Sequence, residues 1–86
     1  MVEEKLKLIY KIVNDLERGK QPTNNDYEID QELFGEMLDI IQLEGLVHGA
    51  VVQRAGRENK VMYVQTKNAK VTIPGLNYLK ENKPQD

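Results

Sequence analysis

The chain has 86 residues, of which 40% are hydrophobic and 30% charged, and this is the composition of one small globular domain with no room for a second. It has no cysteine, which excludes disulfide bonds and thiolate metal sites. No stretch approaches the roughly 18 apolar residues of a membrane span, and the opening residues lack the pattern of a secretory signal. We therefore expect a single domain over residues 1–86 that resides in the cytoplasm and has no membrane partner.

The formal net charge of −2 is unevenly distributed along the chain. Residues 1–25 contain five basic and four acidic side chains, whereas residues 26–44 contain seven acids and no lysine or arginine. Residues 45–86 reverse this balance, with seven basic side chains and three acids. The sequence thus predicts a molecule with one acidic side and one basic side.

Residues 3–18 have the periodicity of an amphipathic helix. The apolar side chains at helical spacing are Leu6, Ile9, Tyr10, Val13 and Leu16. Leu8 and Ile12 widen this arc beyond a single stripe. Two interpretations stay open, namely a helix that is buried on two sides and a homodimer face formed by Leu8 and Ile12.

Residues 19–29 are rich in turn formers, and Gly19 suits the end of the first helix. Thr23 or Asn24 predicts one short helical turn, after which Tyr27 and Ile29 are expected to reach the core.

Residues 31–44 predict a second helix, with Asp30 as its N-cap. Its apolar arc consists of Leu33, Phe34, Met37, Leu38, Ile40 and Ile41, and its polar arc of Gln31, Glu32, Gly35, Glu36, Asp39 and Gln42. Glycine inside a helix costs on the order of 1 kcal/mol relative to alanine. We therefore expect another segment to approach this helix closely at Gly35, and Gly45 to end it.

The rest of the chain predicts a β-hairpin followed by a short helix. The two strands are residues 46–54 and 60–66, joined by the five-residue polar loop 55–59. Residues 67–70 are expected to form a polar loop. Thr72 then caps a helix through about residue 82 that has Pro74 in its first turn and Leu76 and Leu79 facing inward. Residues 83–86 are expected to be a frayed tail.

This order of helix, short turn, helix, hairpin and helix indicates an α+β winged helix, in which the hairpin is the wing. We expect the hairpin to shield the apolar side of the preceding helix and to leave its polar side free. Three groups of residues recur in a known order and spacing, namely Ile29-Asp30, Glu44-Gly45-Leu46-Val47, and Thr72, Gly75 and Tyr78-Leu79-Lys80-Glu81-Asn82. In these residues the sequence resembles the YjcQ-like family of small bacterial and phage winged-helix proteins, and the resemblance covers roughly residues 5–82. It implies a winged-helix fold and a phage- or prophage-associated role, and Pro74 departs from the family pattern, which usually has a charged residue there.

The residue types argue against an enzyme. The chain has no cysteine and no serine, so a Ser–His or Cys–His pair cannot be assembled, and a threonine nucleophile would lack a recognisable context. Its one histidine, His48, lies at the start of a predicted strand. The acids Glu32, Glu36 and Asp39 form one row without a second ligand-bearing segment, which favours a solvated face over a metal site. The six glycines are scattered and form no phosphate-binding loop, so we expect no cofactor and no metal.

DNA binding is the usual work of this architecture, because the helix before the wing commonly enters the major groove. Here the polar arc of that helix has three carboxylates, which DNA phosphates repel. A basic wing formed by Arg54, Arg57 and Lys60 offers a different way to hold DNA.

A protein partner fits the charge asymmetry better. The predicted contact surface is the polar face of the second helix, consisting of Gln31, Glu32, Glu36, Asp39, Gln42 and Leu43. Leu43 is either covered by the wing or is an apolar contact residue ringed by acids, as in the centre of an interface. We therefore expect a non-enzymatic accessory or regulatory protein that acts through protein–protein contacts, with a winged-helix DNA-binding regulator as the alternative.

Overall fold

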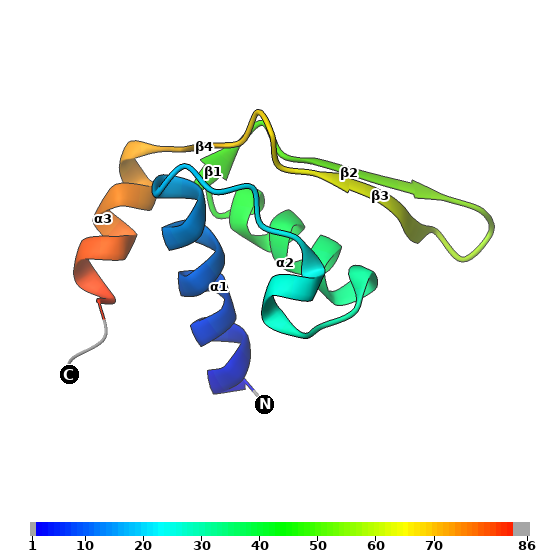
Figure 1. Cartoon of the computed structure of the whole chain (residues 1–86), viewed down its shortest axis with the longest axis horizontal. Coiled ribbons are helices and arrows are strands. Elements are labelled where there is room, and N and C mark those ends of the chain that lie inside the picture. The colour runs from blue at the N-terminus through cyan, green and yellow to red at the C-terminus, as the bar shows by residue number, and fades with distance from the viewer. Residues whose placement is uncertain (1, 84–86) are drawn as a thin grey trace.

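The computed structural model of the protein describes residues 2–83 and has the α+β, winged-helix-like arrangement that the sequence predicts (Figure 1). The elements in chain order are α1 (Val2–Glu17), the 3-10 helix η1 (Asn24–Tyr27), α2 (Gln31–Leu43), β1 (Val47–His48), β2 (Val51–Ala55), β3 (Lys60–Gln65), β4 (Lys70–Val71) and α3 (Ile73–Glu81). Lys83 is exposed, and the remainder of the predicted tail, residues 84–86, lies outside the described residues.

The ends of α1 and α2 follow from local sequence. Gly19 (φ 80°) and Gly45 (φ 75°) both adopt the left-handed conformation that glycine takes without strain. After α1, the Gly19 N–H donates to the Leu16 carbonyl and the Lys20 N–H to the Asp15 carbonyl, which satisfies the last carbonyls of the helix. Asp30 begins α2 as predicted, because its side chain accepts a hydrogen bond from the Leu33 N–H at 2.7 Å.

The core lies between α1, α2 and β1. Its fully buried side chains are Phe34, Ile12, Met37, Leu38, Ile41, Val13 and Val47. Ile12 is 0% exposed, so it has no surface to offer a second copy, and its part in a homodimer face was a wrong prediction. The first interpretation of the wide apolar arc holds, since α1 is buried on more than one side. Leu8 packs against the core and stays partly exposed.

The strands differ from the prediction at Gly49. This residue has φ 90°, and a β-carbon on it would lie 2.5 Å from the carbonyl oxygen of Asn68. The expected strand 46–54 is therefore divided into β1 and β2, which pair with different partners. β1 pairs with β4, which begins at Lys70 in the segment expected to be a loop, whereas β2 pairs with β3 to form the hairpin.

The hairpin projects beyond the helices, and its inner face lies against α2 (Figure 1). The register pairs Val52 with Val64 and Arg54 with Val61, with an irregularity between Gln53 and Arg54. At Gly35 an added β-carbon would lie 2.7 Å from Val61 and 3.2 Å from Val52. The close approach predicted at Gly35 is thus made by the inner face of the wing.

The start of α3 is fixed to the end of α2. The Thr72 side chain accepts a hydrogen bond from the Gly75 N–H at 3.0 Å and donates to the Gly45 carbonyl. A β-carbon at Gly75 would overlap the Leu46 carbonyl oxygen, so only glycine fits there. Leu79 is half-buried as expected, but Leu76 is 42% exposed, so its predicted inward orientation was wrong.

Candidate functional site

The predicted contact face of α2 is held by an arginine of the wing. Arg54 Nη1 lies 3.0 Å from Glu32 Oε2, and Arg54 Nη2 lies 2.7 Å from Asp39 Oδ2. The hydrogen bond with Asp39 is the largest cause that raises the pKa of the Arg54 guanidinium, and the hydrogen bond with Glu32 raises it further. Arg54 spans two turns of the helix and joins both carboxylates to the hairpin.

Further contacts occupy the rest of this face. Glu32 Oε1 accepts a hydrogen bond from the Val61 N–H at 2.9 Å, and Gln42 Oε1 accepts one from the Ala50 N–H at 3.1 Å. Glu36 Oε1 lies 3.8 Å from Lys5 Nζ of α1. The expectation that the wing leaves the polar side of α2 free was wrong, because its hydrogen bonds and Arg54 reach that side. These carboxylates have partners within the chain, so they give no reason to expect an outside cation.

Two members of the predicted face remain unpaired within residues 2–83. Gln31 is exposed at the start of α2, and Leu43 is 83% exposed at its end. The hairpin does not cover Leu43, so the second interpretation of this residue, a free apolar side chain near acids, is the one that the structure allows.

The three predicted wing cations are not equivalent. Arg54 faces α2, and Lys60 Nζ lies 3.2 Å from Glu58 Oε2 at the wing tip. Arg57 is exposed and is the only one of the three without an ion-pair partner among the described residues. The basic wing that the sequence suggested is thus reduced to one uncompensated charge.

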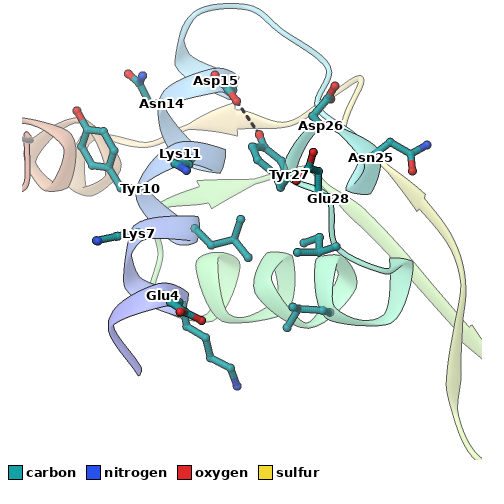
Figure 2. A pocket seen from close by; sticks show the side chains of 14 residues that line it. Glu4, Lys7, Tyr10, Lys11, Asn14, Asp15, Asn25, Asp26, Tyr27 and Glu28 are labelled. Carbon is teal, nitrogen blue, oxygen red and sulfur yellow. Dashed lines mark hydrogen bonds between the residues drawn. The ribbon is translucent and has the colours of Figure 1, made fainter. Parts of the chain in front are cut away.

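A hollow lies elsewhere, between α1 and the segment that runs from η1 into α2 (Figure 2). It is an open groove of about 800 Å³. Its apolar floor, defined as Leu8, Tyr27, Ile29 and Leu33, packs against the core from three different elements. From the sequence, Leu8 is expected either in a helix that is buried on two sides or in a dimer face, and the other three in the core. Periodicity does not predict that the four side chains meet at the surface.

The two sides of the groove have opposite charges. On the α1 side, the rim is defined as Lys7 and Lys11, which are exposed and have no partner among the described residues. Glu4 and Asp15 of the same helix also line the groove. The η1 rim consists of Asp26 and Glu28 on the opposite side (Figure 2). Asp26 Oδ2 accepts a hydrogen bond from the Thr23 N–H at 2.7 Å, so η1 and its rim are fixed in place.

Tyr27 connects the two sides of the groove. Its hydroxyl donates to Asp15 Oδ2 of α1 at 2.7 Å (Figure 2). Burial first, and then the hydrogen bond with Asp15, raises the pKa of the Tyr27 phenol, so it stays protonated as a donor. The Tyr27 ring also lies 6.1 Å from that of Phe34, centroid to centroid, which ties the floor to the core.

A second hollow of about 310 Å³ lies between the end of α1 and residues 66–71. Lys20, Lys67 and Lys70 line it, and Lys20 Nζ lies 3.9 Å from Asp15 Oδ1. The adjacent helix end has the negative pole of the helix dipole, which opposes anion binding. We therefore assign no site there.

Within residues 2–83 the structure gives little support for a metal site, for a histidine in the groove or for a membrane span. No group of three or more metal-ligating side chains gathers in this part of the chain. His48 is exposed on β1 opposite Lys70, away from the groove lining. None of the helices in the same range combines the length and apolar character that a membrane crossing requires.

Comparison with known proteins gives one family. The model of the YjcQ protein family matches residues 6–85, which is nearly the whole chain and includes every residue of the groove floor. No curated protein and no solved structure matches the chain.

Proposed function

The chain belongs to the YjcQ protein family, and from that premise we propose that it is a small, non-enzymatic, cytoplasmic accessory or regulatory protein that binds another protein in the groove between α1 and η1–α2. As the resemblance implies, we place it among phage- or prophage-associated proteins. The observation that carries the proposal is an apolar floor of four side chains, framed by charged rims that are exposed on both sides.

The anatomy of the groove is that of a protein interface. Such interfaces have an apolar centre that is desolvated on binding and a polar rim that stays wet. The floor supplies the centre, because Leu8, Ile29 and Leu33 are only partly buried by their own chain. The absence of serine and cysteine from the sequence, and the position of His48 outside the groove lining, support a binding role over catalysis.

The alternative, a regulator that holds DNA by its wing, has less support. Arg54 and Lys60 already pair with carboxylates of the chain, and DNA phosphates would have to compete for them. The exposed outer side of α2 also presents Glu36 and Asp39 toward any duplex in the major groove. Of the three wing cations, Arg57 alone has no ion-pair partner within residues 2–83.

The test uses a photo-crosslinking amino acid at Lys11 or Glu28, on the two rims, with Lys80 on α3 as the position for comparison. In host lysate we expect a crosslinked protein from the rim positions that is absent from the Lys80 position. Leu8→Gln should weaken capture at least about tenfold, because it places a polar group on the apolar floor. Leu43→Gln is the matched control, since it removes an exposed leucine outside the groove.

Two results would contradict the proposal. One is a partner that Leu43→Gln releases and Leu8→Gln retains, since contact through the outer end of α2 would then be favoured. The other is binding to mixed duplex DNA whose affinity falls steeply with salt and whose salt slope flattens in Arg57→Ala. Circular dichroism of each variant confirms that the fold is retained.

A further inference from the structure

We infer that the groove takes an amphipathic α-helix whose two charged flanks have opposite signs, acidic along α1 and basic along η1. This inference rests on the proposed function and adds the chemistry of the partner. It follows from the opposite charges of the two rims, and each side of the groove contributes a separate argument.

The α1 rim is a short row of free cations. Lys7 and Lys11 are four residues apart, so their side chains leave the same side of α1 about 6 Å apart along its axis. Lys5 is paired with Glu36, and Glu4 has an interaction within the chain, so the row is limited to these two lysines. A helix alongside α1 matches them with acids that are three or four residues apart.

The η1 rim is acidic and fixed. Glu28 is exposed directly after η1 in the left-handed conformation (φ 57°), and it has no partner among the described residues. Asp26 lies two residues earlier and is held by the Thr23 N–H. Asp15 lines the groove from α1, and its charge is offset by Lys20, whose Nζ lies 3.9 Å from Asp15 Oδ1. The η1 side matches basic residues.

The walls favour a helix over an extended peptide. α1, η1 and the start of α2 are helical, and none of the residues that line the groove belongs to a strand. The groove therefore offers no strand edge with which an extended peptide could pair. A helix satisfies its own backbone groups and needs only apolar side chains for the floor.

Charge also excludes uniformly charged ligands. A nucleic acid or an acidic helix attracted by Lys7 and Lys11 meets Asp26 and Glu28 on the other side. A helix that is basic on both flanks meets the reverse conflict at α1. Both rims are matched only by a ligand that has acidic groups on one flank and basic groups on the other.

The experiment uses a displayed library of single helices. Each member has a fixed leucine stripe at helical spacing, and its two flanks are randomised among Glu, Lys and Gln. Selection on the whole chain is expected to enrich Glu on one flank and Lys on the other. Either flank of the peptide can be the acidic one, because a helix can lie in the groove in two directions. The enriched peptide is then synthesised, and its affinity is measured in solution.

The decisive variant is Lys7→Glu with Lys11→Glu, which makes both rims acidic. It should weaken the selected peptide about tenfold or more and should enrich Lys on both flanks in a new selection. The matched control, Lys67→Glu with Lys70→Glu, changes the net charge equally outside the groove and should alter neither result. In 0.5 M salt the difference should shrink, because the rim charges are exposed.

Failure of the inference is distinct from failure of the proposed function. Three results would overturn the inference. They are a selection that enriches no helix, a selection whose helices do not have Glu on one flank and Lys on the other, and equal effects of the two double variants. Crosslinking from the groove that Leu8→Gln abolishes would still support a protein-binding groove with a partner of other chemistry.

Discussion

Arg54 accounts for a feature that the sequence leaves puzzling, which is a helix with three carboxylates on one side and no lysine or arginine of its own. Its guanidinium joins Glu32 and Asp39, and Glu32 also accepts the Val61 N–H. The sequence shows Arg54 only as one of several wing cations. Its partners lie 15 and 22 residues earlier, so the pairing depends on how the hairpin packs against α2.

Arg54→Ala is expected to lower the free energy of unfolding, since two half-exposed carboxylates lose their shared partner. Arg57→Ala removes the same charge from the exposed wing tip and should change stability by less than about 0.5 kcal/mol. Urea unfolding of both variants measures the difference. Equal effects would mean that the contacts of Arg54 with α2 contribute nothing to stability.

The hydrogen-bonded phenol of Tyr27 predicts how the free energy of unfolding depends on pH. The pKa of the Tyr27 phenol is raised in the folded state. Its contribution to the free energy of unfolding is therefore fully present below the ordinary tyrosine pKa of about 10 and is lost as pH rises above that value. The unfolding free energy of the wild type should therefore fall more steeply above pH 10 than that of Tyr27→Phe. Denaturant unfolding from pH 8 to 11 compares the two slopes, and parallel slopes would exclude this role of the phenol.

At the scale of elements, periodicity and caps predicted much of the fold. The helices predicted at 3–18 and 31–44 are found at Val2–Glu17 and Gln31–Leu43, because capping residues and glycines set their ends locally. The division of the first strand at Gly49 was missed, since it depends on the carbonyl of Asn68 nearly 20 residues later. Local sequence does not encode that contact.

Gly75→Ala distinguishes local propensity from tertiary packing. In an isolated helix this change would stabilise by on the order of 1 kcal/mol. In α3 the added β-carbon overlaps the Leu46 carbonyl oxygen, so we expect a loss of about 2 kcal/mol or more. Thermal and urea unfolding report the sign directly.

Gly35→Ala is the comparison for Gly75→Ala, because the added carbon there meets the side chains of Val61 and Val52. Side chains adjust more easily than backbone, so the cost should be smaller than at Gly75. A stabilised Gly75→Ala variant would show that α3 is not fixed against the end of α2.

At the scale of the whole molecule, the groove could not be predicted from the sequence. Its floor combines Leu8 with Tyr27, Ile29 and Leu33, and periodicity assigns all four simply to apolar faces. These four side chains remain partly exposed because of the way in which α1 and η1 pack beside α2. The rims are visible in the sequence as charges, but their opposition across the groove requires the fold.

Ile12 is buried within the chain, so of the two residues of the alternative dimer face only Leu8, on the groove floor, keeps surface for a second copy. We therefore expect sedimentation equilibrium to give the 9.9 kDa monomer at micromolar concentrations. A concentration-dependent dimer that Leu8→Gln disrupts would instead mean that copies of the chain occupy the groove of one another.

The most direct test of the central claim is a map of amide hydrogen exchange for the chain with and without a captured partner. Binding in the groove predicts added protection over residues 7–14 and 25–33, and unchanged exchange at the wing tip, residues 56–59. Protection confined to the wing tip or to the outer end of α2 around Leu43 would contradict the assignment.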